Sequence, residues 1–143
     1  GESFKDIEDS VQRRIKNVSE KLLRYLLFVD EAPLKGSVRG TTLFAKKFEK
    51  MGLKDHQERS FRKFDLNRRL FRYPCSFLIY SPNFAELPTE VLSHIFTRLD
   101  EILTGRDTSK DFRSLSDQDR NAIREILIET SPHAKKFWST ERF

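Results

Sequence analysis

The chain has 143 residues, a size typical of one domain with its own hydrophobic core. It is 37% hydrophobic and 34% charged and contains 13 phenylalanines, which indicates a folded protein with an aromatic core and excludes the composition of a disordered chain. No apolar run approaches the roughly 20 residues that a membrane-spanning helix needs, and a single cysteine, Cys75, excludes an internal disulfide.

The N-terminal segment is predicted to form one long amphipathic helix. Its apolar residues recur at spacings of three and four, as an eleven-residue repeat typical of a nearly straight helix with one apolar stripe. The stripe consists of Phe4, Ile7, Val11, Ile15, Val18, Leu22, Leu26 and Val29. Packing of this helix over the domain is the favoured interpretation, because residues 25–28 widen the stripe at its end. The alternative is a helix that continues upstream into a coiled coil or a stalk. A face that the domain leaves uncovered would dock another helix or another chain.

Residues 30–41 contain one proline and two glycines and are predicted to form a loop. A short helix follows, capped by Thr41 or Thr42, running through Met51 and stopped by Gly52.

The centre of the chain is predicted to hold a second loop and a second short helix. Residues 54–60 are polar and form the loop. Asp65 is placed to cap the helix over residues 66–73, which Pro74 ends. The apolar run 75–80 is either a buried helical turn or a strand, since periodicity cannot decide at this length.

The C-terminal half carries the clearest helical patterns. A helix opens at Pro88 and stops at Gly105, with an inner face of Val91, Leu92, Ile95, Phe96, Leu99, Ile102 and Leu103. Ser116 caps the next helix, over residues 117–129, and residues 135–143 form a packed or frayed tail. Taken together, these predicted elements indicate an all-α fold: a single domain over residues 1–143, built as a compact bundle of four to six helices.

The most basic part of the chain is a window over residues 59–73, with the sequence RSFRKFDLNRRLFRY. Six basic residues and one acid, Asp65, give it a net charge of +5, which equals that of the whole chain. Arginines bind phosphate and carboxylate groups through paired hydrogen bonds, and neighbouring aromatic rings stack on bases. The window therefore indicates an anion site on one face of the predicted short helix, formed by Arg68, Arg69 and Arg72. We expect supporting contacts from Arg39, Arg62, Tyr73 and Tyr80.

The same window also has a structural interpretation, which we favour over nucleic-acid binding. Asp65 lies three and four residues before Arg68 and Arg69, a spacing typical of ion pairs on a helix. Residues 84–131 carry ten acids and six bases, a net charge of −4, and are able to neutralise the window across the fold. No nucleic-acid-binding motif accompanies the basic residues.

Catalytic and metal-binding chemistry has little support in the sequence. Cys75 lies in an apolar segment with no histidine tied to it by spacing, so a structural cysteine is favoured over an activated thiol. Glu90 and His94 are four residues apart, but two ligands without a third make a weak metal site. We expect no metal and no cofactor. An enzyme that uses Cys75 or an acid–arginine pair is the least supported alternative.

The middle of the chain resembles the C-terminal part of a group of uncharacterised bacterial proteins, many of them exported. The resemblance covers residues 22–129, and its most specific part is the pattern FDL-RLF-YPCS-LIYS over residues 64–81. It implies a bacterial source, a location outside the cytoplasm and a domain cut from a longer protein. The group has no established activity, so the resemblance assigns no catalytic residue here.

Together these observations predict a non-enzymatic module of a larger protein, which binds a protein partner, another domain of its parent protein or a small anionic ligand. Direct binding of nucleic acid through the basic window is the first alternative, and enzymatic activity is the second.

Overall fold

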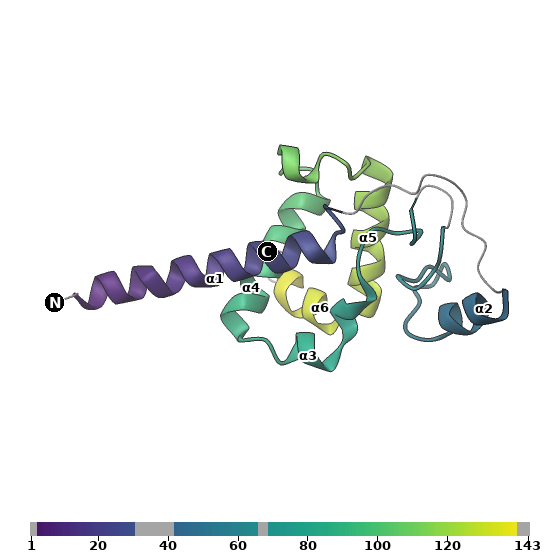
Figure 1. The fold of residues 1–143 in the computed structure, drawn as a ribbon, viewed down its shortest axis with the longest axis horizontal. Helices are drawn as coiled ribbons and strands as arrows, with labels where there is room; N and C mark the ends of the chain where they lie inside the picture. The colour runs from purple at the N-terminus through teal and green to yellow at the C-terminus, as the bar shows by residue number, and fades with distance from the viewer. Residues whose placement is uncertain (1–2, 31–41, 66–68, 140–143) are drawn as a thin grey trace.

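The computed structural model describes residues 3–30, 42–65 and 69–139, and this part of the chain is helical (Figure 1). The α-helices are α1 (Phe4–Leu26), α2 (Thr42–Lys50), α3 (Pro82–Ala85), α4 (Thr89–Leu103), α5 (Asp117–Thr130) and α6 (Pro132–Trp138). Two short 3₁₀ helices accompany them, η1 (Phe77–Tyr80) and η2 (Lys110–Phe112). The prediction of an all-α bundle with a long N-terminal helix is confirmed.

The core is centred on α4, which lies between α1 on one side and α5 and α6 on the other (Figure 1). All of its predicted inner positions are buried, and Ile95, Phe96 and Leu99 have no exposed surface. Burial of such side chains stabilises the fold by about 1.5–3 kcal/mol each. The sequence periodicity of α4 therefore predicted its buried face correctly.

The two halves of α1 have different surroundings. The C-terminal half packs against α4, with Leu23 and Leu26 buried, and the backbone N–H of Ser76 donates to the carbonyl of Leu26 at 2.7 Å. The N-terminal half projects away from the body of the molecule (Figure 1). The expectation that the domain covers the stripe holds only for the C-terminal half, because the apolar side chains of the projecting half remain exposed.

The predicted short helix over residues 66–73 is wrong in its described part. Residues 69–73 are not helical, and Phe64 and Phe71 form an isolated antiparallel bridge. Around it, the N–H of Asp65 donates to the Leu70 carbonyl and the N–H of Arg72 to the Lys63 carbonyl, both at 2.8 Å. On a helix, residues seven apart are separated by about 10 Å along the axis. The bridge instead brings the Phe64 and Phe71 rings into a stack at 5.3 Å.

Two further segments extend the sequence predictions. The run 75–80 contains a helical turn, η1, whose cap Ser76 accepts the Leu78 N–H, so it is not a strand. The predicted C-terminal tail is partly the helix α6. Ser131 caps α6 by accepting the N–H of Ala134, and the indole Nε1–H of Trp138 donates to the Phe96 carbonyl at 2.8 Å.

Candidate interaction site

Arg69, one of the predicted anion-binding residues, is bound to a carboxylate of the protein itself. Its two terminal nitrogens donate to the two oxygens of Asp119, each at 3.0 Å, and one of them also donates to the Arg72 carbonyl at 2.9 Å. Asp119 lies in the first turn of α5, where a negative charge is favourable. This ion pair confirms that an acid from residues 84–131 neutralises part of the basic window.

A second arginine of the window is paired in the same way. The Nε–H of Arg59 donates to the buried carboxylate of Asp55 at 2.7 Å, and its Nη1 lies 3.1 Å from Glu125 of α5. Burial alone would raise the pKa of Asp55, but hydrogen bonds from Arg59 and from the Gln57 N–H outweigh it, and the pKa is lowered. Arg59 therefore joins the loop before the window to α5.

Arg62 is held by aromatic rings. Its guanidinium carbon lies 4.6 Å from the ring centroid of Phe48 and 4.5 Å from that of Phe77, which is cation–π geometry on both sides. Arg72 differs because it is exposed, with its guanidinium carbon 5.0 Å from the ring centroid of the buried Tyr73.

The other predicted site residues do not converge with these. The Tyr80 hydroxyl is 2.6 Å from the Thr130 hydroxyl, and burial raises the pKa of Tyr80. Arg39 and Arg68 lie outside the described residues. Within the described part of the window, the predicted shared face of guanidinium groups does not form, since Arg69 faces Asp119 while Arg72 faces solvent.

Cys75 and His94 lie in structural surroundings. Cys75 has no exposed surface, and burial raises the pKa of its thiol, which disfavours the nucleophilic thiolate. His94 contacts Glu20 of α1 at 3.2 Å, whereas Glu90, its expected metal-binding partner, is exposed. Among the described residues, no three His, Cys, Asp or Glu side chains are grouped as a metal site requires.

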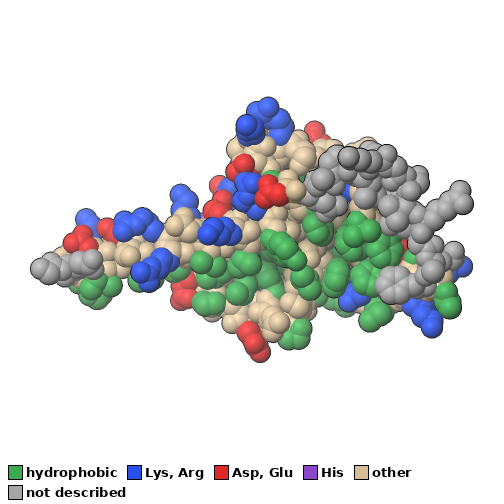
Figure 2. Space-filling model, viewed as in Figure 1, with side chains coloured by type: hydrophobic (Ala, Val, Ile, Leu, Met, Phe, Trp, Pro, Cys, Tyr) green, Lys and Arg blue, Asp and Glu red, His purple; other side chains and the backbone are tan. Residues whose placement is uncertain are grey.

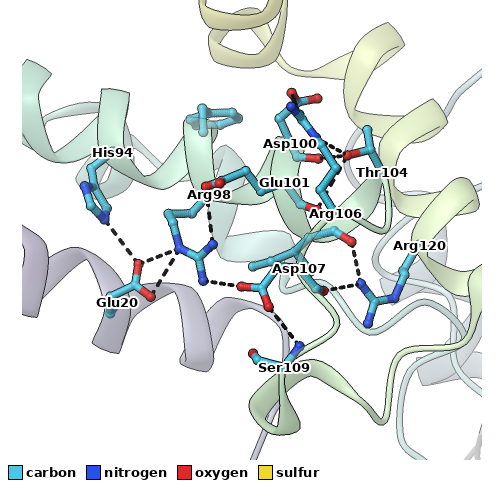
Figure 3. A network of polar contacts seen from close by, with 12 residues as sticks. Glu20, His94, Arg98, Asp100, Glu101, Thr104, Arg106, Asp107, Ser109 and Arg120 are labelled. Atoms are coloured by element: carbon cyan, nitrogen blue, oxygen red, sulfur yellow. Dashed lines mark hydrogen bonds and ion pairs between the residues drawn. The ribbon is translucent and has the colours of Figure 1, made fainter.

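A charged network that the sequence did not predict fixes the base of α1 to α4 (Figure 3). Arg98 of α4 contacts three carboxylates, with Nε 3.1 Å from Glu20, Nη1 3.3 Å from Glu101 and Nη2 2.6 Å from Asp107. The Ser109 N–H also donates to Asp107 at 2.9 Å. Arg98 and Glu101 have helical ion-pair spacing, but Glu20 is 78 residues from Arg98, so helical spacing gave no signal for the contact with α1.

The sequence also did not predict the role of Arg120. Its side chain is buried and has no ion-pair partner among the described residues. It donates instead to four backbone carbonyls, those of Ile102, Asp107, Phe112 and Leu115. These carbonyls include the C-terminal end of α4, where positive charge is stabilising. Arg120 thereby fixes the connection between α4 and α5.

The projecting half of α1 presents an apolar surface that no described part of the chain covers. The exposed fractions are 82% for Phe4, 50% for Ile7, 46% for Val11 and 49% for Val18. Figure 2 shows hydrophobic side chains along one edge of the projecting helix, continuing onto the body. A capping box between Ser3 and Asp6 satisfies backbone N–H groups at the N-terminus of this helix.

No protein-family model, curated protein or solved structure matches this chain. Among the helices that the structure describes, none combines the length and the apolar character needed to cross a membrane.

Proposed function

We propose that this chain is a non-enzymatic protein-interaction module that binds its partner through the projecting half of α1. The observation that carries the proposal is the exposed apolar stripe formed by Phe4, Ile7, Val11 and Val18. Exposure of large apolar side chains to water is unfavourable. Covering them with another surface lowers the free energy, which favours binding of a partner.

The base of α1 is built to hold this surface in place. Leu23 and Leu26 anchor the C-terminal half in the core, and the carboxylate of Glu20 contacts both His94 and Arg98 of α4. A projecting helix with a fixed base presents its stripe in one orientation. Such preorganisation reduces the entropy that is lost when a partner binds.

The basic window supports the same proposal by offering little to an external anion. Arg59 and Arg69 are bound to carboxylates of the protein, and Arg62 lies between two phenylalanine rings. A small anion or a nucleic acid would have to displace these contacts. A protein partner is therefore better supported than the small anion or the nucleic acid that the sequence also suggested.

Photo-crosslinking in the native cells tests this proposal. Benzoylphenylalanine is placed at Val11 or Val18 on the stripe and, as matched controls, at Asp9 or Arg13, which lie about 160° around the helix from the stripe. We expect covalent adducts of higher mass from the two stripe positions and few from the controls. Equal yields from all four positions, or adducts from none, would contradict the proposed function.

A further inference from the structure

We propose that the partner of the projecting helix is a second copy of this chain, bound antiparallel with Val11 facing Val11 across a two-fold axis. This inference rests on the proposed function and names its partner. Three observations carry it: the symmetry of the stripe, the distribution of charge along α1 and the space beside it.

The apolar positions of α1 are spaced symmetrically about Val11. From Phe4 to Val18, with the half-buried Ile15 included, they are separated by three, four, four and three residues, so the order reads the same in both directions. In an antiparallel pair centred on Val11, Phe4 lies level with the partner's Val18, and Ile7 lies level with the partner's Ile15. Every apolar residue of this segment then meets an apolar residue, which a two-fold interface requires.

The charges of the same segment are antisymmetric about Val11, and this selects the antiparallel direction. Residues 5–9 contain Lys5, Asp6, Glu8 and Asp9, for a net charge of −2, whereas residues 13–16 contain Arg13, Arg14 and Lys16, for a net charge of +3. An antiparallel pair places each acidic segment beside the basic segment of its partner. A parallel pair in register places like charges together, which is unfavourable.

These charges are available for a partner, unlike those of the basic window. Glu8 and Arg14 flank the stripe at about 60° from Val11, are exposed and take part in no ion pair within residues 3–30, 42–65 and 69–139. Arg59, Arg69 and Arg98, in contrast, are bound to carboxylates of their own chain. A second copy supplies an opposite charge to the acidic segment and to the basic segment of α1.

The fold leaves space for the second helix. Residues 4–11 precede Gln12 and Ile15, which lie beside α4, so the bodies of an antiparallel pair centred on Val11 lie at opposite ends of the pair. A hollow of about 470 Å³ lies between α1 and α4 and is lined by Ile15, Thr89 and Ser93 among others. It adjoins the position level with the partner's Ile7.

Disulfide trapping tests the direction and the register together. Phe4→Cys and Val18→Cys are made separately, mixed and oxidised; Cys75 does not compete because it is buried. We expect the mixed disulfide between the two variants in at least tenfold excess over either homodimer. Asp9→Cys mixed with Arg13→Cys is the matched control on the opposite face, and we expect little linkage there.

Disulfides that join Phe4→Cys to itself would overturn the antiparallel arrangement, and an absence of any excess over the control would overturn self-pairing. All these positions are exposed, so folding should be unaffected, and circular dichroism checks this.

Charge exchange provides a second measurement that leaves the stripe intact. In sedimentation velocity at low salt, we expect the wild-type chain to dimerise and its dimer to weaken as salt is raised. Glu8→Lys and Arg14→Glu, which lie about 60° from Val11 on either side of the stripe, should each dimerise more weakly than the wild-type chain, while their equimolar mixture dimerises. Unchanged dimerisation of either variant alone would contradict the pairing by charge.

The two proposals fail in different ways. If the wild-type chain stays monomeric and shows no mixed disulfide, while photo-crosslinking at Val11 yields an adduct with a different protein, self-pairing is wrong and the interaction function stands. If the stripe positions give no more adduct than Asp9 and Arg13, both are wrong.

Discussion

Arg69 and Arg120 show how individual arginines are used in this protein. Arg69 binds both oxygens of Asp119, and Arg120 binds four backbone carbonyls in the interior. Arg69 joins segments 50 residues apart, Arg120 joins carbonyls 5 to 18 residues before it, and neither side chain is positioned to bind a ligand. A planar guanidinium with several donors suits this task better than an ammonium group, because it satisfies several acceptors in fixed directions.

Arg69→Ala is expected to destabilise the protein by about 1–3 kcal/mol, because it leaves the mostly buried carboxylate of Asp119 without its partner. Urea unfolding of Arg69→Ala, Asp119→Ala and the double variant measures the coupling between the two side chains. We expect the double variant to lose less than the sum of the single losses. Strict additivity would show that the pair contributes nothing as a unit.

Arg72→Ala is the matched control for that cycle. Arg72 is exposed, and its side chain donates no hydrogen bond to any of the described residues. The free energy of unfolding of the Arg72→Ala variant should stay within about 0.5 kcal/mol of the wild-type value.

At the scale of the elements, the network around Arg98 joins α1, α4 and the connection that follows α4. The Ser109 N–H and the Arg98 guanidinium lower the pKa of Asp107 to about 2 despite its burial. The folded protein thus binds the proton of this carboxyl more weakly than the unfolded chain does. Its contribution to stability is present above the ordinary pKa near 4 and is lost as pH falls toward 2.

We therefore expect the free energy of unfolding to decrease between about pH 5 and pH 2, with Asp107 contributing on the order of 2 kcal/mol to the change. Asp107→Asn should be less stable at pH 7 and should show a shallower decrease. Asp111→Asn is the control, since Asp111 is an exposed carboxylate paired with Arg24. An identical pH profile for wild type and Asp107→Asn would refute this assignment.

The elements also show what the sequence could predict. The buried face of α4 and the cap of α5 at Ser116 follow from local patterns, and both were predicted correctly. The bridge between Phe64 and Phe71 was missed because its stability comes from rings seven positions apart that stack on each other and join Phe48 of α2. Local spacing contains no information about such contacts. The same holds for Arg98 and Arg120, whose partners are fixed only by the packed fold.

For the molecule as a whole, the important feature is the unequal support of α1. Its C-terminal half is buried against α4, but its N-terminal half depends on its own backbone hydrogen bonds and its capping box. An isolated helix of about 15 residues is only marginally stable in water. The exposed stripe that the sequence interpretation expected to be covered thus lies on a helical segment with few tertiary contacts.

Hydrogen exchange should resolve this difference along α1. We expect the amides of residues 8–16 to exchange at least tenfold faster than those of residues 22–26 in dilute protein. Protection of residues 8–16 should rise with protein concentration as the helices pair. Uniform protection along α1 in dilute solution would contradict the unequal support seen in the structure.

The hydrogen bond from Ser76 to the last turn of α1 has a consequence for the order of folding. The carbonyl of Leu26 receives its donor from a residue fifty positions further along the chain (76 − 26 = 50). The base of α1 can therefore be completed only after the chain between them has closed into a loop, which is slow compared with the formation of a helical turn. The free end of α1 forms and melts on its own within microseconds, whereas its base is assembled together with the core.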